Sequence, residues 1–130
     1  MTEILAAETH SASLRIAIVD DEPDLAVLYS KVLQKLGHDS TSIFHDGTSL
    51  VRALTSGETN FDVILMDYRI PEMDGIEAAK ILQRYRKDTK IIMISGYEFA
   101  KDKAAEVGLT FLPKPFSIRQ LAQTLDRMKD

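Results

Sequence analysis

The sequence of 130 residues contains no cysteine and no tryptophan. Without cysteine the chain has no disulfide framework, no thiolate nucleophile and no sulfur ligand for a metal ion. It also has no apolar run that approaches the roughly 20 residues needed to span a bilayer. We therefore predict a protein that works in the reducing cytoplasm and makes no contact with a membrane.

Basic residues are fewer than acidic ones: the sequence has 16 Lys and Arg and 20 Asp and Glu, which give a formal net charge of −4. Proteins that bind nucleic acid directly carry basic patches, so no such partner is expected. The first residues include Glu3 and Glu8 and lack a basic stretch, which argues against a signal peptide. We predict a flexible tail over residues 1–13 and one domain over residues 14–130, which is long enough to enclose a core.

Glycine-rich phosphate loops are missing as well, since neither G-x-x-x-x-G-K-[ST] nor G-x-G-x-x-G occurs. The sequence has instead a regular alternation of strand and helix patterns. Strand patterns lie at 14–19, 40–44, 61–67, 90–95 and 109–115, and helix patterns lie at 23–37, just after Asp46-Gly47, at 75–87, at 98–108 and from Ser117 onward. This alternation predicts an α/β domain whose parallel sheet is covered on both faces.

Two of these helices have features that define their ends and their inner faces. Pro23 suits the first turn of the first helix, and Gly37 suits its end. Ser117 and Gln120 form a predicted capping box at the start of the last helix. The apolar face of the first helix is expected to consist of Leu25, Leu28, Tyr29, Val32, Leu33 and Leu36. The inner face of the last helix is expected to consist of Ile118, Leu121, Ala122, Leu125 and Met128.

Polar or charged residues stand at the ends of four strand patterns. The first pattern runs into Asp20-Asp21, the third ends at Asp67, the fourth at Ser95, and the fifth has Lys114 near its end. In a parallel sheet these ends share one edge, where such folds bind their ligands. Taken singly, an acid at this place is often a helix cap, Ser95 a turn residue and Lys114 a surface lysine. Their convergence at one edge is what predicts a functional site.

The chemistry of these groups narrows the function. Clustered carboxylates repel one another unless a cation joins them, and Mg²⁺ typically takes one or two carboxylates together with water and phosphate oxygens. A lysine and a hydroxyl opposite the carboxylates would stabilise the charge of a phosphoryl group. Because no nucleotide loop is present, the simplest interpretation is a carboxylate that accepts the phosphoryl group and becomes an aspartyl phosphate.

The same residues are similar to those of a known family. Asp20-Asp21, the stretch ILMDYRIPEMDG, Ser95 and the stretch FLPKPF resemble the receiver domain of two-component response regulators, over about residues 14 to 129. The resemblance implies a flavodoxin-like fold, a single doubly wound (βα)5 domain with a five-stranded parallel sheet of order 2-1-3-4-5. It also implies a cis Lys114–Pro115 peptide bond, a form that X–Pro bonds adopt at little cost.

The resemblance further implies a role for each matched residue. Asp67 is the expected phosphoacceptor, and Ser95 and Lys114 are expected to bind the phosphoryl group. Ser95 and Phe111 are the expected switch residues, although Ser95 replaces the commoner Thr and Phe111 lacks the hydroxyl of the frequent Tyr. The expected ligands of Mg²⁺, or of Mn²⁺ in its place, are Asp20, Asp21, Asp67 and the backbone carbonyl of Arg69.

A receiver of this kind is expected to be a phosphorylation-activated signalling switch. It would take its phosphoryl group from a sensor histidine kinase or a histidine phosphotransfer protein, and would catalyse only that transfer and its own slow dephosphorylation. We expect a monomer or a weak phosphorylation-dependent dimer, either as a stand-alone receiver or as part of a larger regulator or hybrid kinase. The face expected to bind a downstream protein combines the fourth helix, the fifth strand and the fifth helix, and includes Phe99, Lys101, Lys103, Phe111 and Arg119.

Two other functions are compatible with parts of the pattern. A Mg²⁺-dependent phosphatase of the haloacid dehalogenase type also forms an aspartyl phosphate, but it needs a second acid two residues after the nucleophile, where this chain has Arg69. The chain also lacks a cap domain to hold a substrate. A flavin or nucleotide binder on the same fold is the third hypothesis, and the acidic turn after the first strand argues against it. Turnover of phosphomonoesters separates an enzyme from a switch.

Overall fold

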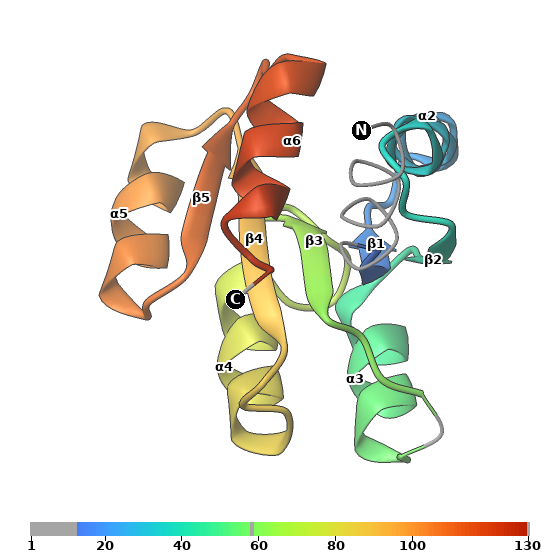
Figure 1. Ribbon diagram of the computed structural model, residues 1–130. Helices are drawn as coiled ribbons and strands as arrows, with labels where there is room; N and C mark the ends of the chain where they lie inside the picture. Colours follow the sequence, from blue (N-terminus) through green and yellow to red (C-terminus); the bar gives the residue numbers. More distant parts are fainter. Residues whose placement is uncertain (1–12, 58, 130) are drawn as a thin grey trace.

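The computed structural model describes residues 13–57 and 59–129. Its five strands form one parallel sheet of order β2-β1-β3-β4-β5, which confirms the predicted fold class and strand order (Figure 1). The strands are β1 (Arg15–Val19), β2 (Ser40–Phe44), β3 (Val63–Asp67), β4 (Lys90–Ser95) and β5 (Thr110–Pro113). The helices are α2 (Pro23–Lys35), α3 (Gly47–Thr55), α4 (Gly75–Tyr85), α5 (Glu98–Glu106) and α6 (Ile118–Asp126).

The helices cover the sheet in two layers because the side chains of each strand alternate between its faces. In β1, Ile16 and Ile18 pack with the buried residues of α2 and α6, whereas Ala17 and Val19 pack with those of α3, α4 and α5. β3 and β4 are buried almost throughout, which explains why both are continuous apolar runs in the sequence. The sheet therefore has a separate apolar core on each face (Figure 1).

Local interactions account for where several helices begin. The Asp46 side chain accepts the Ser49 N–H at 2.7 Å and caps α3. The capping box predicted for the last helix is present, since Ser117 Oγ accepts the Gln120 N–H and Gln120 Oε1 accepts the Ser117 N–H. Gly37 has a φ of 98°, a conformation that suits glycine, and it follows α2 as predicted.

Two residues assigned to inner helix faces are on the surface instead, and for these the sequence prediction was wrong. Ile118 is 59% exposed and Leu28 is 54% exposed. Ile118 is the first residue of α6, so it lies beside the cap rather than over the sheet, where Leu121 and Leu125 are buried. In α2 the predicted Tyr29 and Leu33 are buried, together with Ala26, which was not predicted, and Leu25, Val32 and Leu36 are partly buried against the same core.

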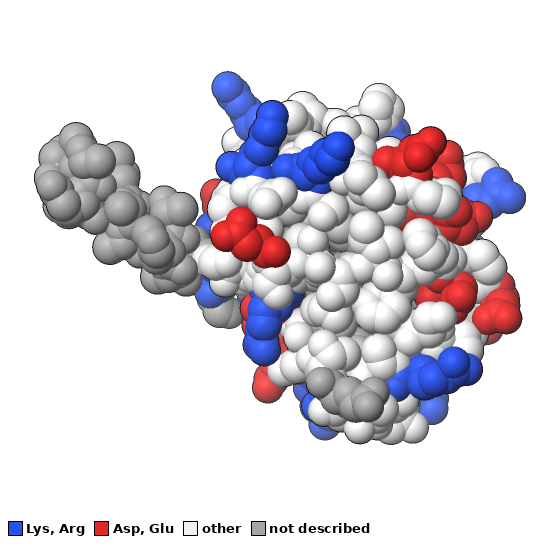
Figure 2. Space-filling view, turned by 90° about the vertical axis from the view of Figure 1, so that its right-hand side faces the viewer, with Lys and Arg blue, Asp and Glu red and all other residues white. Residues whose placement is uncertain are grey.

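The surface on the α2 and β2 side carries its charges in separate groups. Figure 2 shows groups of Lys and Arg and groups of Asp and Glu at several places around the rim of this face, with uncharged surface between them. No helix within residues 13–57 and 59–129 is both long enough and apolar enough to cross a membrane. The tail predicted for residues 1–13 lies, except for Ser13, outside the described residues.

Candidate functional site

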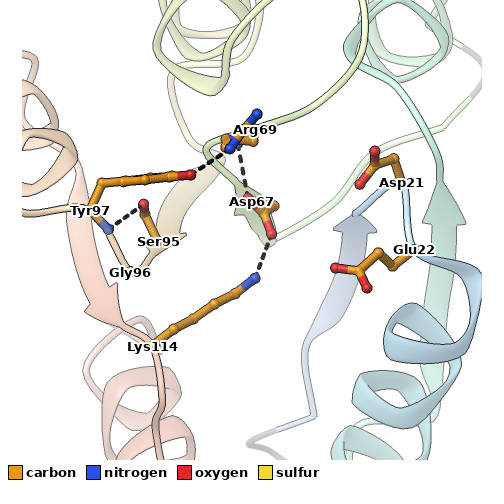
Figure 3. Close-up of a pocket in the computed structure, with 8 residues that line it drawn as sticks. All are labelled: Asp21, Glu22, Asp67, Arg69, Ser95, Gly96, Tyr97 and Lys114. Atoms are coloured by element: carbon orange, nitrogen blue, oxygen red, sulfur yellow. Dashed lines mark hydrogen bonds and ion pairs between the residues drawn. The ribbon is translucent and has the colours of Figure 1, made fainter.

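A pocket of about 530 Å³ lies at the edge of the sheet where the strands end (Figure 3). It is at the point where the strand order reverses between β1 and β3, the place where doubly wound sheets bind ligands. The register brings the ends together, since Asp67 pairs with Ile94 in β4 and Ser95 pairs with Pro113 in β5. The pocket is lined by Asp21, Glu22, Asp67, Arg69, Ser95, Gly96, Tyr97 and Lys114.

Asp67 and Lys114 form the ion pair at the centre of the pocket. Lys114 Nζ lies 2.7 Å from Asp67 Oδ2, and the Arg69 backbone N–H donates to Asp67 Oδ1 at 2.9 Å. Burial lowers the pKa of Lys114, but the hydrogen bond and the charge of Asp67 outweigh it and raise the pKa overall. The lysine is therefore a fixed positive charge beside the carboxylate. The Lys114–Pro115 peptide bond is cis, as predicted.

Asp20 is not among the residues that line the pocket and is only 1% exposed. Its Oδ1 accepts the Glu22 N–H at 2.9 Å, but within the described part of the chain its buried Oδ2 has no hydrogen-bond partner. Burial raises the pKa of Asp20, the hydrogen bond from Glu22 lowers it, and the charge of Asp67 raises it further. A buried carboxylate oxygen without a partner is unfavourable unless a proton or a cation compensates it.

Asp21 and Glu22 occupy one side of the pocket, and their carboxylates point toward Asp67 (Figure 3). Glu22 is the N-cap residue of α2, yet its side chain makes no capping hydrogen bond. Glu22 was not among the site residues predicted from the sequence. Its position next to Asp21 was the only signal, because side-chain direction in a strand-to-helix turn cannot be read from spacing.

Ser95 closes the opposite side of the pocket. It is 3% exposed, and its Oγ accepts the Tyr97 backbone N–H at 3.0 Å. The Lys114 N–H donates to the Ser95 carbonyl at 3.0 Å, so the end of β4 fixes where the lysine leaves the sheet. Gly96 leaves this turn open, since an added Cβ would approach only Lys114, at 3.9 Å. The hydroxyl and the ammonium group thus face the same space.

A contact between the side chains of Arg69 and Tyr97 was not predicted. The Arg69 guanidinium donates to the Tyr97 hydroxyl and also lies 5.6 Å from the centre of its ring. The Tyr97 ring in turn lies 5.2 Å from that of Phe99. This contact joins the turn after β3 to the turn after β4 at the edge of the pocket (Figure 3). In the sequence, the only sign of this contact is that Tyr97 follows Ser95, the hydroxyl residue at the end of the strand, by two positions.

Phe111, one of the predicted switch residues, is not in the pocket. It is half-buried in β5 and packs against the core beneath α3, α4 and α5. Phe99 on α5 is 48% exposed, and Lys103 lies 5.6 Å from the centre of its ring. Two connections run from the pocket to this face: the paired ends of β4 and β5, and the ring of Tyr97, which lines the pocket and lies 5.2 Å from that of Phe99.

The acidic groups provide hard oxygen donors of the kind that Mg²⁺ prefers. Within residues 13–57 and 59–129, however, no group of three or more His, Cys, Asp or Glu side chains is arranged to hold a metal ion. A site in which only two carboxylates and a backbone carbonyl bind the ion directly fits this finding, because it needs fewer than three such side chains. The buried Asp20 Oδ2 and the pocket-facing Asp21 are the groups that a cation would compensate.

Known proteins similar to this chain share one type of domain. The family model of the response regulator receiver domain matches residues 16–126. Sensor kinase CckA of Brucella abortus is 35% identical over 91% of this chain and 13% of the kinase. Response regulator receiver protein CpdR of Brucella abortus is 33% identical over 88% of this chain and 95% of that protein.

A solved structure gives the same comparison in three dimensions. The receiver domain of sensor histidine kinase PA1611 from Pseudomonas aeruginosa PAO1 has a magnesium ion coordinated in its active site cleft. It matches this chain with a TM-score of 0.78 and 25% identity, over 90% of this chain and 98% of that domain.

Proposed function

The chain belongs to the response regulator receiver family, and on that premise we propose that it is a signalling switch turned on by phosphorylation of Asp67. One observation carries the proposal: Lys114 Nζ lies 2.7 Å from Asp67 Oδ2 in a pocket that Asp21 and Ser95 also line. This arrangement has a nucleophile, a fixed positive charge and a hydroxyl within one small space. Receiver domains are signalling modules, so we do not class the chain with enzymes that turn over a substrate.

In the proposed reaction, a lone pair of the Asp67 carboxylate attacks the phosphorus of a phosphohistidine on the donor protein. The O–P bond forms as the P–N bond breaks, and the imidazole nitrogen keeps the electron pair of the broken bond and takes up a proton. The Arg69 N–H and Lys114 each hold one oxygen of Asp67, which fixes the orientation of the carboxylate before attack. Slow attack of water on the phosphorus then restores the carboxylate and releases phosphate.

We propose that Lys114 and Ser95 bind the phosphoryl oxygens once they arrive. Lys114 keeps its proton, because the charge and hydrogen bond of Asp67 outweigh the effect of burial on its pKa. The Ser95 hydroxyl already accepts the Tyr97 N–H through its oxygen, so its own proton can be donated to a phosphoryl oxygen. Preorganised donors of this kind stabilise charge that develops during transfer.

Mg²⁺ is the cation that we propose for the site, with Mn²⁺ as the alternative. Asp20, Asp21, Asp67 and the Arg69 backbone carbonyl would hold it. Two observations support this choice: Asp20 Oδ2 has no hydrogen-bond partner among the residues that the structure describes, and the PA1611 receiver domain has a magnesium ion in its active site cleft. A bound divalent ion supplies positive charge that offsets the repulsion between the carboxylates and the phosphoryl oxygens.

We further propose that phosphorylation changes the face made of α5, β5 and α6. Ser95 would move toward the phosphoryl group and leave space beside β4, into which Phe111 would turn. Burying a fully exposed aromatic ring is worth roughly 1.5–3 kcal/mol, and because Phe111 is already half-buried the turned state gains only a part of that. The half-buried position of Phe111 and the exposed rings of Tyr97 and Phe99 support this face as the one that a downstream protein recognises.

The proposed phosphodonor is a sensor histidine kinase or a histidine phosphotransfer protein. This chain spans 13% of the length of CckA and 95% of the length of CpdR. Its relatives therefore include both a receiver domain within a larger protein and a separate receiver. The oligomeric state, the absence of a nucleic-acid partner and the location in the cytoplasm stay predictions from the sequence.

Acetyl phosphate and Mg²⁺ test the proposed function directly. The wild-type protein should gain at most one hydroxylamine-labile phosphoryl group, seen by intact-mass spectrometry, and should not turn over a phosphomonoester. Asp67→Asn should gain none, whereas the control Asp24→Asn should label normally, because Asp24 is exposed on α2 and outside the pocket. Normal labelling of Asp67→Asn, or sustained turnover of the phosphomonoester, would contradict the proposal.

A further inference from the structure

Lys114 must keep a long side chain in one place if it is to meet a phosphoryl group on Asp67. It follows β5, an edge strand of the sheet, and its side chain is 30% exposed. The four-carbon stem is flexible and loses much rotamer freedom when it is fixed. The ion pair with Asp67 holds only the tip, and that pair must loosen when the phosphoryl group arrives. A second contact is therefore needed to direct the stem.

An apolar groove beside the pocket provides a surface for that stem. Its volume is about 490 Å³, and it lies between α2 and the connection from β5 to α6. Lysine stems pack along apolar surfaces of this kind while the ammonium group stays in a polar environment. The groove is lined by Leu25, Leu28, Tyr29, Lys114, Pro115 and Phe116.

Tyr29 is the most firmly held of the α2 residues in this groove. It is 8% exposed, and its ring stacks on that of Phe116 with centroids 5.7 Å apart and planes at 30°. The stack joins α2 to the β5–α6 connection, and both residues pack with the core on that face of the sheet. Leu25 is only half-buried and Leu28 is mostly exposed, so neither gives Lys114 an equally fixed wall.

The phenol of Tyr29 also lies in the electrostatic field of the site. Burial raises the pKa of Tyr29, and the charges of Lys114, Asp20 and Asp67 act on it as well. A phenol that stays neutral places no negative charge beside Lys114. It therefore does not compete with Asp67 for the ammonium group, and the part of Tyr29 that matters to Lys114 is its ring.

We propose that Tyr29 is a positioning residue for the reaction at Asp67, because its ring, fixed on Phe116, directs the Lys114 ammonium group toward the phosphoryl oxygens. Tyr29 does not touch the phosphoryl group and acts only through Lys114. The inference rests on the proposed function, since it assigns a role to Tyr29 in phosphorylation of Asp67. It predicts that an aromatic ring at position 29 is required and that its hydroxyl is not.

The test measures the rate of Mg²⁺-dependent labelling by acetyl phosphate, per mole of folded protein. Tyr29→Leu should slow labelling about tenfold, since a small displacement of a catalytic group is enough to lower a rate by one or two orders of magnitude. Tyr29→Phe keeps the ring and should label within about twofold of the wild type. Leu33→Val shortens a fully buried residue of the same helix and should also label within about twofold, which controls for a general effect on the core.

A double-mutant cycle separates positioning from structural support. Lys114→Met keeps an apolar stem without the ammonium group, so Tyr29→Leu should cause no further slowing in the Lys114→Met protein. If Tyr29→Leu does not fold, Phe116→Leu removes the other ring of the stack and should give the same loss and the same dependence on Lys114. Labelling of Tyr29→Leu at the wild-type rate, or equal slowing with and without Lys114, would overturn the positioning role alone. A wild-type protein that takes no label at Asp67 would overturn the proposed function itself, and this inference with it.

Discussion

Replacing Asp20 by asparagine should stabilise the metal-free protein and remove its response to Mg²⁺. Asp20 is almost completely buried, and within the described residues its Oδ2 has no hydrogen-bond partner. A buried acceptor without a partner costs about 1–3 kcal/mol, and a charged one costs more. Asparagine fills the same space, keeps an oxygen for the Glu22 N–H and carries no charge. We expect the free energy of unfolding in EDTA to rise by about 1–2 kcal/mol.

The pH dependence of this gain follows from the direction in which the pKa moves. Burial raises the pKa of Asp20 above its ordinary value of 3.8, and the charge of Asp67 adds to that effect against the Glu22 hydrogen bond. The folded protein therefore binds this proton more tightly than the unfolded chain does. It loses stability as the pH rises from 3.8 through the folded-state pKa. The advantage of Asp20→Asn should be complete at neutral pH and should vanish below 3.8.

Urea denaturation followed by circular dichroism, in EDTA and in Mg²⁺, measures both parts of this prediction. Mg²⁺ at ten times its Kd should stabilise the wild type by about 1.4 kcal/mol, and Asp20→Asn by much less. Asp24→Asn is the control, since it removes an exposed carboxylate from the first turn of α2, four residues after Asp20, without touching the pocket. An Asp20→Asn protein that is less stable than the wild type in EDTA, or that gains equally from Mg²⁺, would refute the view that Asp20 is an uncompensated buried charge.

Three further predictions concern other parts of the fold. Burial lowers the pKa of His38 below 6.5, and its Nδ1 accepts the Leu14 N–H. The free energy of unfolding should therefore be highest above pH 6.5 and fall as the pH drops from 6.5 through the folded-state pKa. A free energy of unfolding, measured with urea, that does not change with pH below 6.5 would contradict this. Gly75→Ala should lower the free energy of unfolding by about 1–3 kcal/mol, because the new Cβ would lie 2.8 Å from Met93 Sδ and 3.1 Å from the Asp67 carbonyl oxygen. In the control Gly96→Ala the new Cβ meets nothing closer than 3.9 Å, so urea denaturation should show almost no change. With beryllofluoride and Mg²⁺, the wild type should show amide NMR shifts near Phe99 and Lys103, and Ser95→Ala should lose them; retained shifts would show that the hydroxyl is not the trigger.

The sheet and its functional edge could be predicted from the sequence because both follow from simple patterns. β3 and β4 are apolar runs buried on both faces, so their existence and their ends at Asp67 and Ser95 are visible in the composition, whereas β3 begins at Val63, two residues later than predicted. Asp67 and Ser95 end these strands, and parallel strand ends must meet at one edge. The order of the strands came from the family resemblance, and the last strand next to β4 brings Lys114 to Asp67.

Side-chain directions at turns and helix ends could not be predicted in the same way. Ile118 continues the apolar period of α6, yet it lies beside the cap and is exposed. Glu22 stands at an N-cap position but leaves the cap unmade and faces the pocket. The contact between Arg69 and Tyr97 joins two turns that are 28 residues apart, so only the three-dimensional structure brings it into view.

The central claim is that Asp67 carries the phosphoryl group, and trapping the acyl phosphate measures this most directly. After incubation with acetyl phosphate and Mg²⁺, borohydride reduces an aspartyl phosphate to homoserine, which peptide mass spectrometry locates in the sequence. We predict homoserine at position 67 alone, and none when Mg²⁺ is replaced by EDTA. Homoserine at another position, at Asp21 for example, or none at position 67 in protein that has gained a phosphoryl group, would contradict the account.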